Sequence, residues 1–167
     1  MPITCRLLAL TPPTAASVIA DSGVLADALA SARNHSDVYR YWHAIEYLLG
    51  QHRPDLPVAK WLRLGQPVSA ASGDVPAARV VPAEDVAQLA AALREIEPEA
   101  LAPHYDAEAL DQAGIYPRQW REWEETFDPL GQVLEHYSFL REFAGNCAST
   151  GDALLLYFKL IAEGALD

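Results

Sequence analysis

Apolar positions recur every three to four residues between residues 37 and 49. This spacing places them on one side of a helix, and they are Val38, Tyr41, Trp42, Ile45, Leu48 and Leu49. Gly50 follows, at the place where a glycine commonly ends a helix. The pattern predicts an amphipathic helix of about 13 residues, roughly 20 Å long, with Trp42 packed in the core.

Short apolar runs near both ends of the chain predict strands. Residues 3–10 are mostly apolar and stop before Thr11-Pro12, a pair typical of a helix start. Residues 153–158 form a near-continuous apolar run, which is typical of a strand covered on both faces. Residues 78–81 predict another short strand.

Four further segments have the apolar period of a helix, and they are 12–21, 24–32, 82–96 and 129–147. In the last of them, Asp128 is a suitable N-cap and Pro129 a suitable first residue. The polar residues 33–36 predict a turn. The proline- and glycine-rich residues 51–77 predict irregular structure.

Together these elements predict one α+β domain over residues 1–167. We expect a small mixed sheet that includes the N- and C-terminal strands and is wrapped by about five helices. A chain of 167 residues with 51% apolar residues can bury about 70% of its unfolded surface without disulfides. Cys5 and Cys147 are expected as buried free thiols.

The chain is strongly acidic, with 12 basic against 23 acidic side chains and a formal net charge of -11. Because this field repels polyanions, we expect neither nucleic acid nor a membrane surface as a partner. Most of the excess lies between Glu95 and Asp128. The N-terminus lacks a basic region and a long apolar run, so we expect a cytoplasmic protein.

No motif of a known catalytic site is present. Glycine-rich phosphate loops, nucleophile elbows, zinc-ligand spacings and His-Glu-x-x-His pairs are absent from the sequence, and we expect no cofactor and no metal. His43 and Glu46 are three residues apart on one helical face, where a carboxylate can orient an imidazole and raise its pKa. The pair suggests either acid–base chemistry or an ordinary surface hydrogen bond.

Aromatic residues gather beside arginines between residues 115 and 123. Tyr116, Trp120 and Trp123 flank Pro117 and Arg118 in this short segment. Aromatic walls with a few polar groups are typical of small-ligand pockets. A rigid proline-anchored turn that covers the core is the alternative interpretation.

Four sequence blocks stand in a characteristic order along the chain. They are Tyr41 to Gly50, Ile115-Tyr116-Pro117 with Trp120, Tyr137 to Phe143, and Ala148 with Gly151 to Leu155. In this order and spacing the chain resembles the YfbM-like family of small bacterial proteins of unknown function. The resemblance implies one compact α+β domain and no assigned reaction. Glu46 stands where the family often has histidine, which removes a two-histidine site. Residues 75–81 lack the family's glycine-led start of a strand, so no ligand contact is carried over to that loop.

The residues support two classes of function. One is a non-catalytic binding or protein-interaction module, immunity-type or regulatory, whose acidic segment 95–128 faces a basic protein partner. The other is a small-molecule enzyme or ligand-binding domain. Its pocket would be formed by Trp42, His43, Glu46, Tyr116 and Trp120. An apolar pocket of roughly 300 Å³ or more at these residues would favour the second class, and its absence the first. Oligomeric state is left open.

Overall fold

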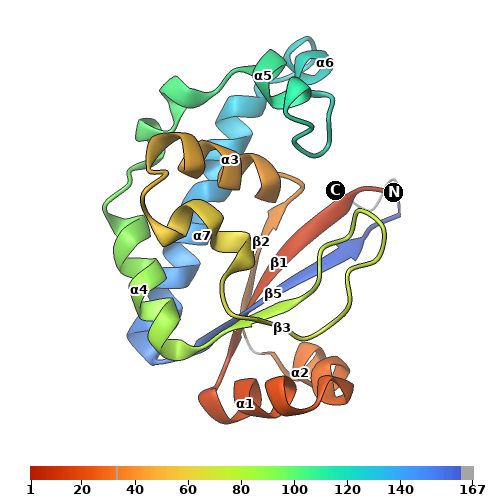
Figure 1. Cartoon of the computed structure of the whole chain (residues 1–167), viewed down its shortest axis with the longest axis vertical. Coiled ribbons are helices and arrows are strands. Elements are labelled where there is room, and N and C mark those ends of the chain that lie inside the picture. Colours follow the sequence, from red (N-terminus) through yellow and green to blue (C-terminus); the bar gives the residue numbers. More distant parts are fainter. Residues whose placement is uncertain (33, 163–167) are drawn as a thin grey trace.

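The structure is a computed structural model that describes residues 1–32 and 34–162, and Figure 1 shows the whole arrangement. The strands are β1 (Ile3–Leu10), β2 (His35–Tyr39), β3 (Gln66–Pro67), β4 (Arg79–Val81) and β5 (Ala153–Leu160). The α-helices are α1 (Pro12–Ala20), α2 (Leu25–Ser31), α3 (Trp42–His52), α4 (Ala83–Arg94), α5 (Ala107–Gln112), α6 (Trp120–Glu124) and α7 (Pro129–Thr150). Short 3₁₀ helices are η1 (Ser22–Val24), η2 (Pro57–Arg63), η3 (Pro98–Ala100) and η4 (Ala102–His104).

The strands form one sheet in the order β2-β1-β5-β4-β3. β1 and β5 pair along their whole length, from Ile3 opposite Leu160 to Leu10 opposite Ala153. The predicted α+β fold, with both terminal strands in the sheet, is confirmed. The expectation of a mixed sheet is wrong in one respect, because every strand pairing among the described residues is antiparallel.

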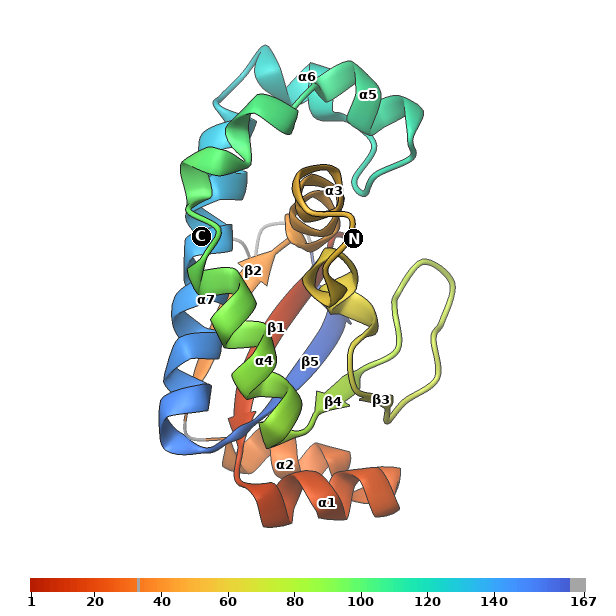
Figure 2. The ribbon, with the colours of Figure 1, turned by 60° about the vertical axis from the view of Figure 1, so that its left-hand side comes forward.

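The sheet separates two hydrophobic cores. Alternate residues of a strand point to opposite faces, so Leu7 of β1 faces the larger core while Leu8 faces the smaller one. The larger core lies between the sheet and α3, α4 and α7, and the smaller core lies against α1 and α2. Figure 2 shows α4 running along α7, with α5 and α6 at one end of the molecule.

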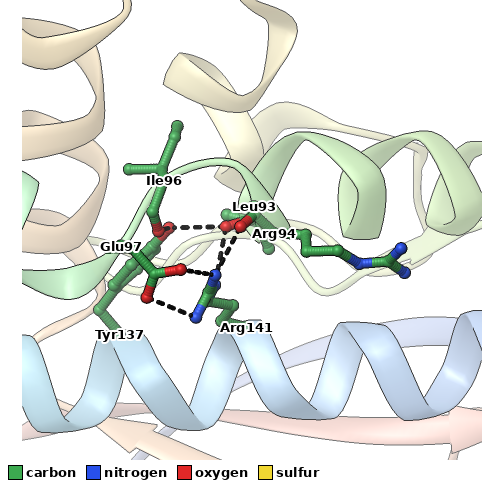
Figure 3. Close-up of polar contacts among 6 residues, drawn as sticks. All are labelled: Leu93, Arg94, Ile96, Glu97, Tyr137 and Arg141. Atoms are coloured by element: carbon green, nitrogen blue, oxygen red, sulfur yellow. Dashed lines mark hydrogen bonds and ion pairs between the residues drawn. The ribbon is translucent and has the colours of Figure 1, made fainter.

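Two side chains of α7 satisfy backbone carbonyls at the C-terminal end of α4 (Figure 3). The Tyr137 hydroxyl donates to the Ile96 carbonyl at 2.8 Å. Arg141 donates through Nε to the Leu93 carbonyl at 2.9 Å and through Nη2 to Glu97 Oε1 at 2.7 Å. Because the last carbonyls of a helix lack partners within it, these bonds fix α4 to α7.

Residues 35–39 depart from the prediction. They form β2, whereas the sequence pattern predicts a turn at 33–36 and a helix from 37; Arg33 of that turn lies outside the described residues. The helix α3 begins only at Trp42 and continues through Gly50 to His52, so Gly50 is not its end. Short helices α5 and α6 also appear where none is predicted.

Burial of the two cysteines and of Trp42 follows the prediction. Cys5 and Cys147 are buried free thiols, and burial raises the pKa of Cys147 to about 12. Trp42 is 5% exposed. The thiols therefore behave as small apolar side chains, since a nucleophilic cysteine needs a lowered pKa.

Candidate functional site

Three of the predicted site residues meet in one stack of rings. The indole of Trp42 stacks with the rings of both His43 and Tyr116, with centroid distances of 5.2 Å and 5.3 Å. The backbone N–H of Tyr116 donates to Nδ1 of His43 at 3.0 Å. The structure therefore joins the start of α3 to the loop that precedes α6.

This stack also holds the first residue of β1. The Ile3 N–H donates to the Tyr116 hydroxyl at 2.7 Å, and Nε1 of Trp42 donates to the Ile3 carbonyl at 3.3 Å. The pairing of β1 with β2 ends at Cys5, opposite Tyr39. The two aromatic side chains thus take the place of a neighbouring strand at Ile3 and satisfy its backbone groups.

His43 is held as a neutral imidazole. Because Nδ1 accepts the Tyr116 N–H, the ring proton of the neutral form is assigned to Nε2. Burial lowers the pKa of His43, and the positive charges of Arg118 and Arg63 lower it further. The expected pairing with Glu46 predicts a raised pKa, so that prediction is wrong.

Glu46 turns to a different partner. Its Oε2 accepts the backbone N–H of Leu62, at the end of η2, at 3.0 Å. Burial raises the pKa of Glu46, although this hydrogen bond and the nearby positive charges act in the opposite direction. In the part of the chain that the structure describes, no hydrogen bond joins Glu46 to His43.

Trp120 lies apart from this stack. It is fully buried, its Nε1 donates to the Ile115 carbonyl at 3.0 Å, and its backbone N–H donates to Asp111 Oδ1 at 2.9 Å. These bonds are those of a rigid turn that covers the core. Each of four cavities of about 330 to 400 Å³ in the described residues is lined by side chains other than the five predicted ones.

One of these cavities lies where β2 ends and α3 begins. Its volume is about 330 Å³, and it is lined by Tyr39, Arg40, Tyr41, Gln132 and His136. Tyr39 has a φ of 46°, a left-handed conformation that is strained for a residue with a bulky side chain. The guanidinium of Arg40 lies over the ring of Trp123, 4.7 Å from its centroid.

Aromatic rings connect this cavity to the core and to the surface. Adjacent ring centroids are 4.6 to 6.0 Å apart, and the rings belong to Tyr39, Tyr41, Trp120, Trp123, Phe127, His136 and Phe139. Three of them, Tyr39, Phe127 and Phe139, are 39%, 39% and 38% exposed. We call these three residues the aromatic face.

His136 lies in the wall of the cavity and is only 5% exposed. The distance between its Nδ1 and the Gln132 carbonyl is 2.7 Å, so Nδ1 carries the proton and Nε2 has the free lone pair. Burial lowers the pKa of His136; the Gln132 hydrogen bond and the carboxylates of Glu135 and Asp37 oppose this effect. The sequence pattern gives one signal for this residue, a histidine inside the apolar stripe of α7.

The acidic segment 95–128 supplies several helix caps. Asp106 accepts the Ala109 N–H at 3.0 Å, Asp128 accepts the Gly131 N–H at 2.9 Å, and Asp111 caps α6. The remaining exposed carboxylates form no ion pair within the described residues, apart from Glu97 with Arg141. They are Glu95, Glu99, Glu108, Glu122, Glu124 and Glu125. Part of the negative charge is therefore structural, and part forms no ion pair within the described residues.

The described residues have neither a cluster of metal ligands nor a helix suited to span a membrane. They contain no group of three or more histidine, cysteine, aspartate and glutamate side chains arranged to hold a metal ion. None of their helices has both the length and the apolar composition needed to span a bilayer.

Comparisons with known proteins agree with the expected family. The crystal structure of YfbM from Escherichia coli, a protein of unknown function, superimposes with a TM-score of 0.63 at 13% identity, covering 93% of this chain and 99% of that one. At this identity the likeness shows the fold alone. No curated protein matches the chain. The family model described as a domain of unknown function, DUF1877, matches residues 1–157. The chain therefore belongs to the DUF1877 family, and the expected resemblance to YfbM-like proteins is confirmed.

Proposed function

We propose that the chain is a non-catalytic protein-interaction module, immunity-type or regulatory, that binds a basic partner protein. The observation that carries this proposal is the position of the aromatic face among free carboxylates. Interfaces commonly have aromatic residues at their centre and charged residues at their rim. Exposed rings without a role in the core are suited to such a centre.

Carboxylates flank the exposed rings on two helices. Glu124 and Glu125 come just before Phe127, while Glu135 and Glu142 lie one turn on either side of Phe139 on α7. These four side chains are exposed and form no ion pair within the described part of the chain. A partner with lysine and arginine side chains around an apolar contact complements this arrangement.

The hydrogen bonds of His43 and Glu46 to backbone amides give both side chains a structural role. A general acid or base needs an ionisable atom within reach of substrate. His43 Nδ1 and Glu46 Oε2 are each occupied by a backbone N–H. The four cavities described above are lined by other residues, so none of them supports a small-molecule pocket at the five predicted residues.

The test compares two variants with the same change in net charge. Glu124→Gln/Glu125→Gln removes charge beside Phe127, and Asp27→Asn/Glu84→Gln removes the same charge from exposed positions on α2 and α4. Each immobilised protein is incubated with extract from cells that naturally produce the chain, and bound proteins are identified over a range of salt concentrations.

We expect the wild-type chain and the Asp27→Asn/Glu84→Gln variant to retain the same basic protein. Its binding weakens steeply with salt because exposed charges are screened beyond roughly 10 Å at 0.1 M. The Glu124→Gln/Glu125→Gln variant retains at least several-fold less of it. Equal retention by both variants, or capture that does not respond to salt, contradicts the proposal.

A further inference from the structure

The cavity at the end of β2, beside α7, shares Tyr39 with the aromatic face but adds polar groups that binding of a basic protein does not use. Its lining combines the rings of Tyr39 and Tyr41 with the polar groups of Arg40, Gln132 and His136. At about 330 Å³ it lies at the small end of ligand-binding cavities. A single ring with one polar substituent is the size of ligand that fits such a space.

Arg40 sets the charge of the ligand. Its guanidinium is half-buried, lies over the face of Trp123 and forms no ion pair among the described residues. Arg79 is likewise half-buried without an ion pair, but its guanidinium donates to the Leu64 and Gly65 carbonyls, whereas Arg40 faces Trp123 and lines the cavity. Its planar fork of donors matches a carboxylate in a bidentate geometry, and stacking on Trp123 reduces the entropy lost on binding.

His136 adds a second polar contact. Because Nδ1 is bonded to the Gln132 carbonyl, only Nε2 can face a ligand. That atom accepts a hydrogen bond from a neutral ligand, and it donates one to an anion when the ring gains a proton. Glu135 and Asp37 are the carboxylates that act on this imidazole, and Arg40 is the opposing positive charge in the cavity lining.

The rings select the body of the ligand. Tyr39 meets His136 edge to face, with centroids 5.3 Å apart and planes at 83°, and Tyr41 lies 4.6 Å from the same ring. Holding Tyr39 at a φ of 46° costs conformational energy that a glycine or asparagine would avoid. This conformation puts Tyr39 in the lining of the cavity. Its ring favours a flat, aromatic ligand.

We infer that this cavity binds a small aromatic carboxylic acid, with its carboxylate on Arg40 and its ring against Tyr39 and Tyr41. The site goes beyond the proposed partner binding and does not depend on it. It also differs from the site expected at His43 and Glu46, since no lining residue is shared.

Benzoate is the probe, used with two matched compounds. Acetate has the carboxylate without the ring, and benzyl alcohol has the ring without the charge. Binding is followed by NMR through the imidazole signals of His136, at concentrations up to about 10 mM, where a ligand of this size and ordinary efficiency binds. We expect saturable shifts with benzoate and an affinity at least tenfold greater than that of either matched compound.

Variants locate the binding. Arg40→Gln is expected to weaken benzoate at least tenfold and Arg40→Lys to weaken it less, because lysine keeps the charge and loses the fork. Arg121→Gln removes an exposed arginine of α6 and should change the affinity less than twofold. Thermal unfolding of each variant confirms that it is folded. Binding of acetate as tightly as benzoate, unchanged affinity in Arg40→Gln, or no shift of His136 overturns the inference.

Binding of benzoate to the Glu124→Gln/Glu125→Gln variant separates the two proposals. That variant retains Arg40, Tyr39 and His136, so its affinity for benzoate should stay within twofold of the wild-type value. Loss of partner capture together with retained benzoate binding supports both proposals. Failure of benzoate alone contradicts the ligand site and leaves the partner surface standing.

Discussion

Tyr116 is bonded to His43 through its backbone and to Ile3 through its hydroxyl. The Tyr116 N–H donates to His43 Nδ1 at 3.0 Å, and its Oη accepts the Ile3 N–H at 2.7 Å. One residue of the loop before α6 thereby links α3 to the first strand. The ring of Trp42 stacks with Tyr116 and its Nε1 donates to the Ile3 carbonyl, so Trp42, His43 and Tyr116 together connect α3 to β1.

Tyr116→Phe should lower the free energy of unfolding by about 1 to 3 kcal/mol. The substitution keeps the ring and leaves the Ile3 N–H without its acceptor, which is the cost of a buried unpaired donor. Chemical denaturation measures the change. Tyr47→Phe is the control. Tyr47 lies on α3, is half-buried like Tyr116, and has no hydrogen bond through its hydroxyl among the described residues. Equal losses in the two variants would show that the Tyr116 hydroxyl has no special role.

Trp42→Ala should cost about 3 to 5 kcal/mol, since it removes a large side chain from the core. Trp42→Phe keeps a smaller ring against Tyr116 and loses the bond from Nε1 to the Ile3 carbonyl. It should cost clearly less. Unfolding midpoints of the two variants check the order, and a Trp42→Ala midpoint close to wild type would contradict core packing.

Stability should fall as the pH drops below about 6.5. Burial lowers the pKa of His43 and of His136 in the folded state, so below 6.5 the unfolded chain binds more protons. Their contribution is fully present above the unfolded pKa and is lost as the pH falls through the folded pKa. The free energy of unfolding is measured between pH 5 and pH 8.

Glu46 must be replaced in this comparison because its contribution to stability changes with pH in the opposite direction. Its raised folded pKa means that its contribution is present below the unfolded value and is lost as the pH rises through the folded one. The titration is therefore made in Glu46→Gln, with and without His43→Asn. A shallower loss of stability on the acid side when His43 is replaced is the expected result. An unchanged slope would count against the assignment of His43 as a neutral buried acceptor.

The sequence pattern predicts the long elements well because their apolar positions repeat over many residues. Helix α7 and strands β1 and β5 appear within a few residues of their expected bounds. β2 escapes prediction since only Val38 of its five residues is buried, and pairing with β1 defines the strand. Val38 and Tyr41 happen to fit the period of the following helix, which extends the predicted helix too far.

Helical spacing alone does not predict which groups hydrogen-bond to each other in the candidate site. His43 and Glu46 are one helical turn apart, yet their partners are the backbone amides of Tyr116 and Leu62. Such partners lie far along the chain and come into reach only through the tertiary fold. The cavity at His136 combines residues of β2, of the turn before α3 and of α7, and no local motif brings them together.

Photo-crosslinking reports whether a partner protein contacts the aromatic face. A photoreactive phenylalanine analogue is placed at Phe127, 39% exposed on the aromatic face, and separately at Ile19, 36% exposed on α1. In cells that naturally produce the chain, we expect one cross-linked basic protein from position 127, lost in Glu124→Gln/Glu125→Gln and absent from position 19. The same products from both positions, or none from position 127, would contradict a partner surface at the aromatic face.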